Sequence, residues 1–149
     1  MANRDDSPIQ ARRILVPVNG NPTDHDMVTL ACQIGRANRG EVHAIYIIEV
    51  KRSLPLDADL PQEATRGEEV LDRAEEIAGE LDETIQTELL QARDVGTAIV
   101  DEAINREADL ILLGINYEKR FGEFSMGKTV PYVLKNAPCR VWICRQAIA

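Results

Sequence analysis

Residues 13–22 read RILVPVNGNP, and this stretch, with the segments that follow it, indicates the fold class. Its first part, RILVPV (13–18), is almost continuously apolar, as is typical of a strand buried on both faces of a sheet. The run ends at the turn-forming residues NGNP. Here Asn21 followed by Pro22 predicts a helix N-cap and a proline in the first helical turn. A buried strand that turns directly into a helix indicates an α/β protein.

Helix and strand patterns alternate through the rest of the chain. The helix that starts at Asn21 has a stop signal at Gly40. After it the sequence predicts a strand at 41–50, a loop at 51–64 that leads into a helix at 62–81, a strand at 84–91, a helix that opens at Gly96, a strand at 109–113, a charged and aromatic segment at 115–126, a helix at 130–136 and a strand at 140–145. The polar–apolar alternation of the third strand favours an edge of the sheet.

The order of these elements predicts the topology. Each strand–helix–strand unit joins two parallel strands through a right-handed crossover. We therefore expect an α/β domain built on a doubly wound five-stranded parallel sheet with helices on both faces. In such sheets ligands bind beyond the carboxyl ends of the strands, where the winding direction reverses. The functional residues are therefore expected in the loops after the first and fourth strands.

Composition narrows the class of protein. The 149 residues include 25 acidic and 17 basic side chains, a formal net charge of −8, which argues against nucleic acid as a partner. No apolar stretch approaches the ~20 residues of a membrane span. The three cysteines, Cys32, Cys139 and Cys144, form neither a disulfide framework nor a zinc motif, which favours reduced thiols and a cytoplasmic location. We expect a flexible tail at 1–11 and one domain at 12–149.

A short motif near the end of the chain admits a P-loop interpretation. Residues 122–129, GEFSMGKT, match G-x-x-x-x-G-K-[ST], the pattern of a phosphate-binding P-loop. A P-loop follows a buried strand directly, whereas residues 114–121 separate this motif from the strand at 109–113. The context therefore argues against a P-loop hydrolase, and an ATPase ranks third among the functions that we consider.

Four segments of the chain resemble the universal stress protein family. They are RRILVPVNGNP (12–22), ADLILLG (108–114), MGKTV (126–130) and APCRVWIC (137–144), and they occur in the family's order of elements. The resemblance implies the adenine nucleotide alpha hydrolase-like fold, with strand order 3-2-1-4-5. It also implies a dimer and, in one branch of the family, an ATP site with the Mg²⁺ that accompanies the nucleotide.

The resemblance also implies which residues would bind the nucleotide. ATP-binding members carry G-x-x-G, nine further residues and then G-[ST]; Gly114 and Gly127 match the first and third glycines, whereas Tyr117 and Lys128 depart from the pattern. Asn19 replaces an aspartate that contacts the ribose, and the backbone of Ile47 matches the position that recognises the base. The full set of expected binding residues is Pro17, Val18, Asn19, Ile47, Gly114, Asn116, Tyr117, Gly127, Lys128 and Thr129.

These departures leave two functions open. Tyr117 restricts the approach of a phosphate that glycine would permit, while Lys128 near a helix N-terminus would attract one. The chain is therefore either a stress-type regulatory protein that binds an adenine nucleotide or a nucleotide-free dimeric interaction module of the same fold. No nucleophile–base pair or carboxylate pair stands out, so we expect at most slow ATP hydrolysis. The apolar last strand, with Val141, Trp142 and Ile143, is expected to form the dimer contact.

Overall fold

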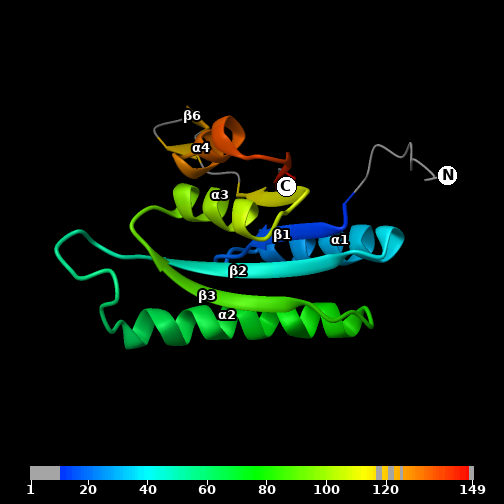
Figure 1. Cartoon of the computed structure of the whole chain (residues 1–149), viewed down its shortest axis with the longest axis horizontal. Helices are drawn as coiled ribbons and strands as arrows, with labels where there is room; N and C mark the ends of the chain where they lie inside the picture. The colour runs from blue at the N-terminus through cyan, green and yellow to red at the C-terminus, as the bar shows by residue number, and fades with distance from the viewer. Residues whose placement is uncertain (1–10, 117–118, 121–122, 125, 148–149) are drawn as a thin grey trace.

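The computed structural model describes residues 11–116, 119–120, 123–124 and 126–147. Its main sheet has five parallel strands in the order β3-β2-β1-β4-β7, as Figure 1 shows in part. Their bounds are β1 Arg13–Pro17, β2 Glu41–Glu49, β3 Gln86–Ala92, β4 Leu110–Ile115 and β7 Arg140–Arg145. Because β7 is the fifth strand of this sheet, the predicted doubly wound fold with order 3-2-1-4-5 is confirmed. The predicted edge position of the third strand is confirmed as well.

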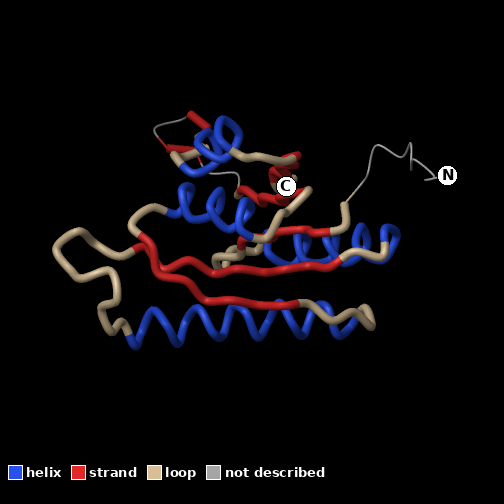
Figure 2. The backbone as a smooth tube through the Cα atoms, in the orientation of Figure 1, coloured by secondary structure: helices blue, strands red, loops and turns tan. Residues whose placement is uncertain are grey.

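Helices cover both faces of the sheet, as Figure 2 shows. The helices of the described residues are α1 Thr23–Asn38, α2 Pro61–Glu80, α3 Val95–Asn105 and α4 Thr129–Asn136. On one face, α1 and α2 enclose a core that includes Val16, Val28, Ala74 and Leu112. On the other face, α3 and α4 pack over a second core around Leu15, Ile45, Ile99, Ile111 and Val133. None of the helices in the described part of the chain combines the length and apolarity needed to cross a membrane.

The winding direction changes between β1 and β4. β1 pairs with β2 from Arg13 to Pro17 and with β4 only at Ile14 and Leu15. The crossover from β1 leads to α1 on one face, whereas the crossover from β4 leads to α4 on the other. The carboxyl ends of these two neighbouring strands therefore diverge and leave space between their loops.

The start of α1 differs from the prediction. Pro22 is the N-cap residue and no side chain caps the helix, so the assignment of Asn21 as the cap was wrong. The reason lies in the preceding turn, where Asn19 Oδ1 accepts a hydrogen bond from Asn21 N (3.0 Å). The backbone carbonyl of Asn21 in turn accepts from Asp24 N (3.0 Å). The turn thus satisfies these backbone groups before the helix begins.

The charged segment at 115–126 contains structure that its sequence does not predict. Lys119–Arg120 (β5) and Glu123–Phe124 (β6) pair as a two-stranded antiparallel sheet. Strands of this length carry too few residues to show a period of two. The GEFSMGKT motif therefore runs through β6 toward α4 and does not follow a buried strand directly, as a P-loop does.

Candidate functional site

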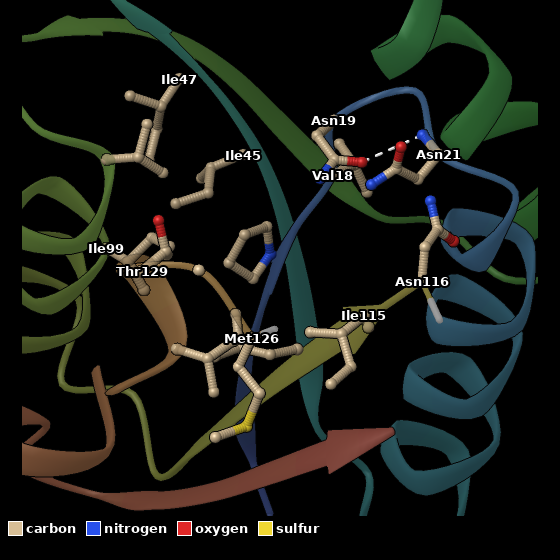
Figure 3. A pocket seen from close by; sticks show the side chains of 16 residues that line it. Val18, Asn19, Asn21, Ile45, Ile47, Ile99, Ile115, Asn116, Met126 and Thr129 are labelled. Carbon is tan, nitrogen blue, oxygen red and sulfur yellow. Dashed lines mark hydrogen bonds between the residues drawn. The ribbon is translucent and has the colours of Figure 1, made fainter. Parts of the chain in front are cut away.

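A cavity of about 440 Å³ opens beyond the carboxyl ends of β1 and β4, at the position predicted from the strand order. Figure 3 shows side chains that line it. Its size falls within the range of about 300–1,000 Å³ that is usual for small-molecule sites. Eight of the ten residues expected to bind a nucleotide lie around it: Pro17, Val18, Asn19, Ile47, Gly114, Asn116, Gly127 and Thr129.

The other two expected residues stand apart from this group. Lys128 is exposed and does not line the cavity; its Nζ lies 3.3 Å from Glu49 Oε1. Tyr117 lies outside the described residues. The structure therefore gathers most of the expected residues in one place, but it pairs the expected phosphate-attracting lysine with a carboxylate.

Half of the cavity wall consists of residues that sequence reasoning missed. Most of them are apolar: Ile45, Val95, Ile99, Leu113, Ile115, Met126 and Val130, together with the polar Asn21. Strand register could have found Ile45, because it lies beside Pro17 in the parallel pair. The helical spacing of Val95 and Ile99 is also a visible signal, since residues four apart share a face of a helix. The seven apolar side chains line one part of the cavity, which we call the apolar slot.

A stretch of β2 in the cavity wall has no strand beside it on one side. The ladder between β1 and β2 ends at Pro17, after which Val18 N donates to Ile45 O (2.9 Å). Alternate residues of a strand present their backbone groups to the same side. The N–H and C=O of Ile47 therefore point toward the space left where β1 ends, and Ile47 lines the cavity there. One donor and one acceptor lie next to each other at the cavity wall.

The loop between β1 and α1 is held by its own polar groups. Asp24 accepts hydrogen bonds from Gly20 N (2.7 Å) and Asn19 N (3.3 Å). Burial raises the pKa of Asp24, and these two backbone hydrogen bonds offset part of that rise. Since Asn19 Oδ1 already accepts from Asn21 N, its Nδ2 donor is the group best placed to meet a ligand. Figure 3 shows this contact at the edge of the cavity.

The two glycines that match the family pattern, Gly114 and Gly127, are required by the structure for different reasons. A Cβ on Gly114 would come within 2.8 Å of Met27 Cγ and 2.9 Å of Thr23 Cβ, so this glycine lets α1 pack closely against β4. Gly127 has a φ of +69° and nothing within 4 Å of an added Cβ. Its glycine serves the left-handed backbone of the turn into α4. Only the second glycine therefore shapes the cavity rim through its conformation.

Asn116 contributes a polar atom that lacks a partner. Its Oδ1 is buried and has no hydrogen-bond partner within the described part of the chain. The side chain lines the cavity and points toward Asn21 in Figure 3. A buried carbonyl oxygen without a donor costs about 1–3 kcal/mol. This amide is therefore the residue of the cavity that gains most when a ligand or an ordered water donates to it.

Three charged residues adjoin the end of the cavity formed by Gly127 and Thr129. Lys128 lies between those two residues and pairs with Glu49, as described above. Asp94 precedes the lining residue Val95 and caps α3, accepting hydrogen bonds from Thr97 N (2.9 Å) and Thr97 Oγ1 (3.0 Å). These bonds lower the pKa of Asp94, and the positive charge of Lys128 lowers it further. This end of the cavity thus holds charges of both signs.

The groups that line the cavity are suited to holding a ligand. Among the described residues, no cluster of three histidine, cysteine or carboxylate side chains is arranged to hold a metal ion. Burial raises the pKa of the Cys32, Cys139 and Cys144 thiols, which keeps them in the less reactive neutral form. The cavity instead offers an apolar slot, a backbone donor–acceptor pair, and amide and backbone groups around its edge.

Comparisons of the sequence and of the fold with known proteins point to the same family. The model of the "Universal stress protein family" matches residues 10–145. A universal stress protein of Methanocaldococcus jannaschii is 27% identical over 141 residues, which cover 91% of this chain and 82% of that protein. A solved universal stress protein from Archaeoglobus fulgidus has a TM-score of 0.74 at 19% identity, covering 88% of this chain and 96% of its own.

A second Archaeoglobus fulgidus structure, a universal stress protein in complex with dAMP, has a TM-score of 0.71 at 20% identity, covering 88% of this chain and 95% of its own. At these identities the solved structures support the fold alone. The family model goes further, because its match runs from before β1 to the last residue of β7 and includes the whole cavity wall. The resemblance seen in the sequence is thereby confirmed, and the chain belongs to the universal stress protein family.

Proposed function

We propose that this universal stress protein is a regulatory protein that binds an adenine nucleotide in the cavity beyond β1 and β4. The observation that carries the proposal is the end of the β1–β2 ladder at Pro17, which leaves the backbone N–H and C=O of the lining residue Ile47 facing the cavity. Adenine is flat and presents a donor and an acceptor next to each other, N6–H₂ and N7 on one edge. A strand N–H and C=O that point the same way complement such an edge, while Ile45 and Ile99 offer apolar surface to the ring.

The same cavity also offers polar groups that can bind the ribose and the phosphate of a nucleotide. The amides of Asn19 and Asn116 lie where they can bond ribose hydroxyls. Gly127 and Thr129 lie at the start of α4, where backbone N–H groups and the helix dipole favour a phosphate. The relative from Archaeoglobus fulgidus that was solved with dAMP shares this fold and supports the choice of an adenine nucleotide. ATP, with Mg²⁺ bound to its phosphates, belongs to the same ligand class.

The second candidate is a nucleotide-free interaction module that acts as a homodimer. Two observations favour it: Asn19 Oδ1 is engaged in its own loop, and Lys128 is paired with Glu49.

In either case we propose a cytoplasmic homodimer that forms through β7. Its edge position and half-buried apolar side chains support that contact.

The decisive experiment identifies a ligand that copurifies with the protein. Small molecules released by acid from freshly purified protein are identified by mass spectrometry, and thermal unfolding is followed with and without millimolar AMP or Mg-ATP. We expect an adenine nucleotide in the extract and a higher unfolding temperature with added ligand. Recovery of no nucleotide, together with no thermal shift, would leave the interaction module as the better account.

A variant that fills the cavity makes this test specific. Ile47→Trp places a large ring on the cavity wall and should abolish the ligand-induced thermal shift. Ile104→Trp is the matched control, because Ile104 is 54% exposed on α3 and does not line the cavity. The control should retain the shift of the unmodified protein. An equal shift in both variants would place the ligand elsewhere.

A further inference from the structure

Three charged residues form one rim of the cavity, and we name Glu49, Asp94 and Lys128 the charged rim. Glu49 follows the lining residue Ile47 by two positions on β2, so their side chains emerge on the same face. The other two members are direct sequence neighbours of lining residues: Asp94 precedes Val95, and Lys128 follows Gly127. All three therefore border the end of the cavity where α3 and α4 begin.

The sum of these charges is negative. Two carboxylates and one ammonium give 1 − 2 = −1 for the charged rim at neutral pH. Lys128 is already engaged, since its Nζ lies 3.3 Å from Glu49 Oε1. Asp94 is fixed in place because it caps α3 through Thr97. A site that binds a polyphosphate normally presents unpaired cations to the outer phosphates. The described side chains of the charged rim instead carry more negative than positive charge.

We propose that the charged rim makes the cavity select adenosine or an adenosine monophosphate over the corresponding triphosphate. This inference rests on the proposed function, because it concerns the ligand of that same cavity. The first phosphate meets the backbone N–H groups at the start of α4, which favour an anion. Each further phosphate adds negative charge near Lys128, whose Nζ lies 3.3 Å from Glu49 Oε1 and whose charge also acts on Asp94. The rim therefore opposes the added charge while leaving the base and ribose contacts unchanged.

Titration calorimetry with adenosine, AMP and ATP tests this selection. The measurements use the full chain at low ionic strength in EDTA, so that neither salt nor a divalent cation masks the ligand charge. We expect AMP to bind about fivefold more tightly than ATP, the effect of two extra charges several ångströms from a net charge of −1 in a water-like medium. Raising the salt concentration to about 0.5 M should bring the two affinities closer.

Removal of one rim carboxylate should remove the selection. Glu49→Gln makes the rim neutral and releases Lys128, so the AMP-to-ATP affinity ratio should fall to about one. Asp94→Asn serves as a second variant, because asparagine keeps the cap of α3 while losing the charge. Glu68→Gln is the matched control: it makes the same change in net charge on α2, which covers the opposite face of the sheet, and should leave the ratio unchanged.

The outcomes separate this inference from the function on which it rests. Equal or tighter binding of ATP by the unmodified protein overturns the selection but leaves adenine-nucleotide binding in place. A preference for AMP that persists in both Glu49→Gln and Asp94→Asn shows that the charged rim is not its cause and also overturns the inference. If none of the three ligands binds, the proposed function itself fails.

Discussion

At the scale of single residues, Gly127 and Gly79 form a matched pair. An added Cβ would have open space at both positions, but Gly127 has a φ of +69° whereas Gly79 lies within α2. We expect Gly127→Ala to lower the free energy of unfolding by about 1–2 kcal/mol, because an L-residue is strained in the left-handed region. Gly79→Ala should raise it by about 0.4–1 kcal/mol. Urea denaturation of the two variants checks both signs, and destabilisation by equal amounts would contradict the account.

Asn116 gives a second prediction at this scale, because its buried Oδ1 lacks a partner among the described residues. Asn116→Leu replaces the amide by an apolar group of similar size. We expect the unliganded variant to be more stable by about 1 kcal/mol, since the cost of the unsatisfied oxygen disappears. Nucleotide affinity should fall at the same time. Thermal unfolding and calorimetry measure the two effects, and a variant that loses stability without losing affinity would give Asn116 a purely structural role.

The residues of the candidate site were only partly predictable from the sequence. The polar and glycine positions could be listed because they match positions of the family that the chain resembles, as with Asn19, Gly114 and Gly127. Pairing between distant segments was not visible, so the contact of Lys128 with Glu49 was missed. The engagement of Asn19 Oδ1 within its own loop was missed for a different reason, because this local contact depends on the exact turn geometry.

At the scale of the elements, the cap of α3 links stability to pH. Hydrogen bonds from Thr97 and the charge of Lys128 lower the pKa of Asp94 from its ordinary value of 3.8. The ionised cap therefore stabilises the fold above pH 3.8, and this contribution is lost as the pH falls through the lowered folded-state pKa. We expect Asp94→Ala to lower the free energy of unfolding by about 1 kcal/mol at pH 7. The deficit should shrink in urea titrations performed at progressively lower pH.

Asp94→Asn is the control for this prediction. Asparagine is as good an N-cap as aspartate, so most of the stability at pH 7 should remain. The asparagine amide does not titrate, so any remaining stability difference between Asp94→Asn and the unmodified protein reflects the ionised carboxylate. This difference should also disappear at low pH, where the carboxylate is protonated. A deficit of Asp94→Ala that stays constant from pH 7 to about pH 2 would show that the cap is not ionised as described.

Elements with a strong hydrophobic period were predictable, and short elements were not. The buried runs of β1 and β4 and the apolar face of α2 have clear sequence patterns, and the structure confirms them. β5 and β6 contain two residues each, too few for any period. The cap of α1 was misassigned because asparagine is favoured both in turns and at helix caps. Here Asn19 and Asn21 form the turn, in which Asn21 N donates to Asn19 Oδ1, and Pro22 is the N-cap residue.

At the scale of the whole molecule, the edge strand β7 predicts self-association. Its side chains Val141, Trp142 and Ile143 are half-buried, whereas Ile111 and Leu112 of the neighbouring β4 are fully buried. Leu134 on the preceding helix α4 is 51% exposed. We expect a dimer at micromolar concentration in sedimentation velocity, because pairing of the edges would cover this apolar surface.

A pair of leucine substitutions locates the dimer contact. Leu134→Glu should weaken the dimer at least tenfold, because it places a charge on the exposed apolar surface of α4, the helix that leads directly into β7. Leu56→Glu is the control, since Leu56 is 47% exposed but lies in the loop between β2 and α2. A monomeric unmodified protein, or equal weakening by both substitutions, would argue against a contact through β7.

We expect an adenine nucleotide to occupy the cavity beyond β1 and β4. Titration of the isotopically labelled protein with AMP, followed by assigned backbone amide NMR shifts, tests this because all residues except the prolines can be observed at once. We expect saturable shifts at Ile47, Asn116, Gly127 and Thr129, with little change at Glu69 and Arg73 on α2. No shift at millimolar AMP, or shifts confined to α2, would contradict it.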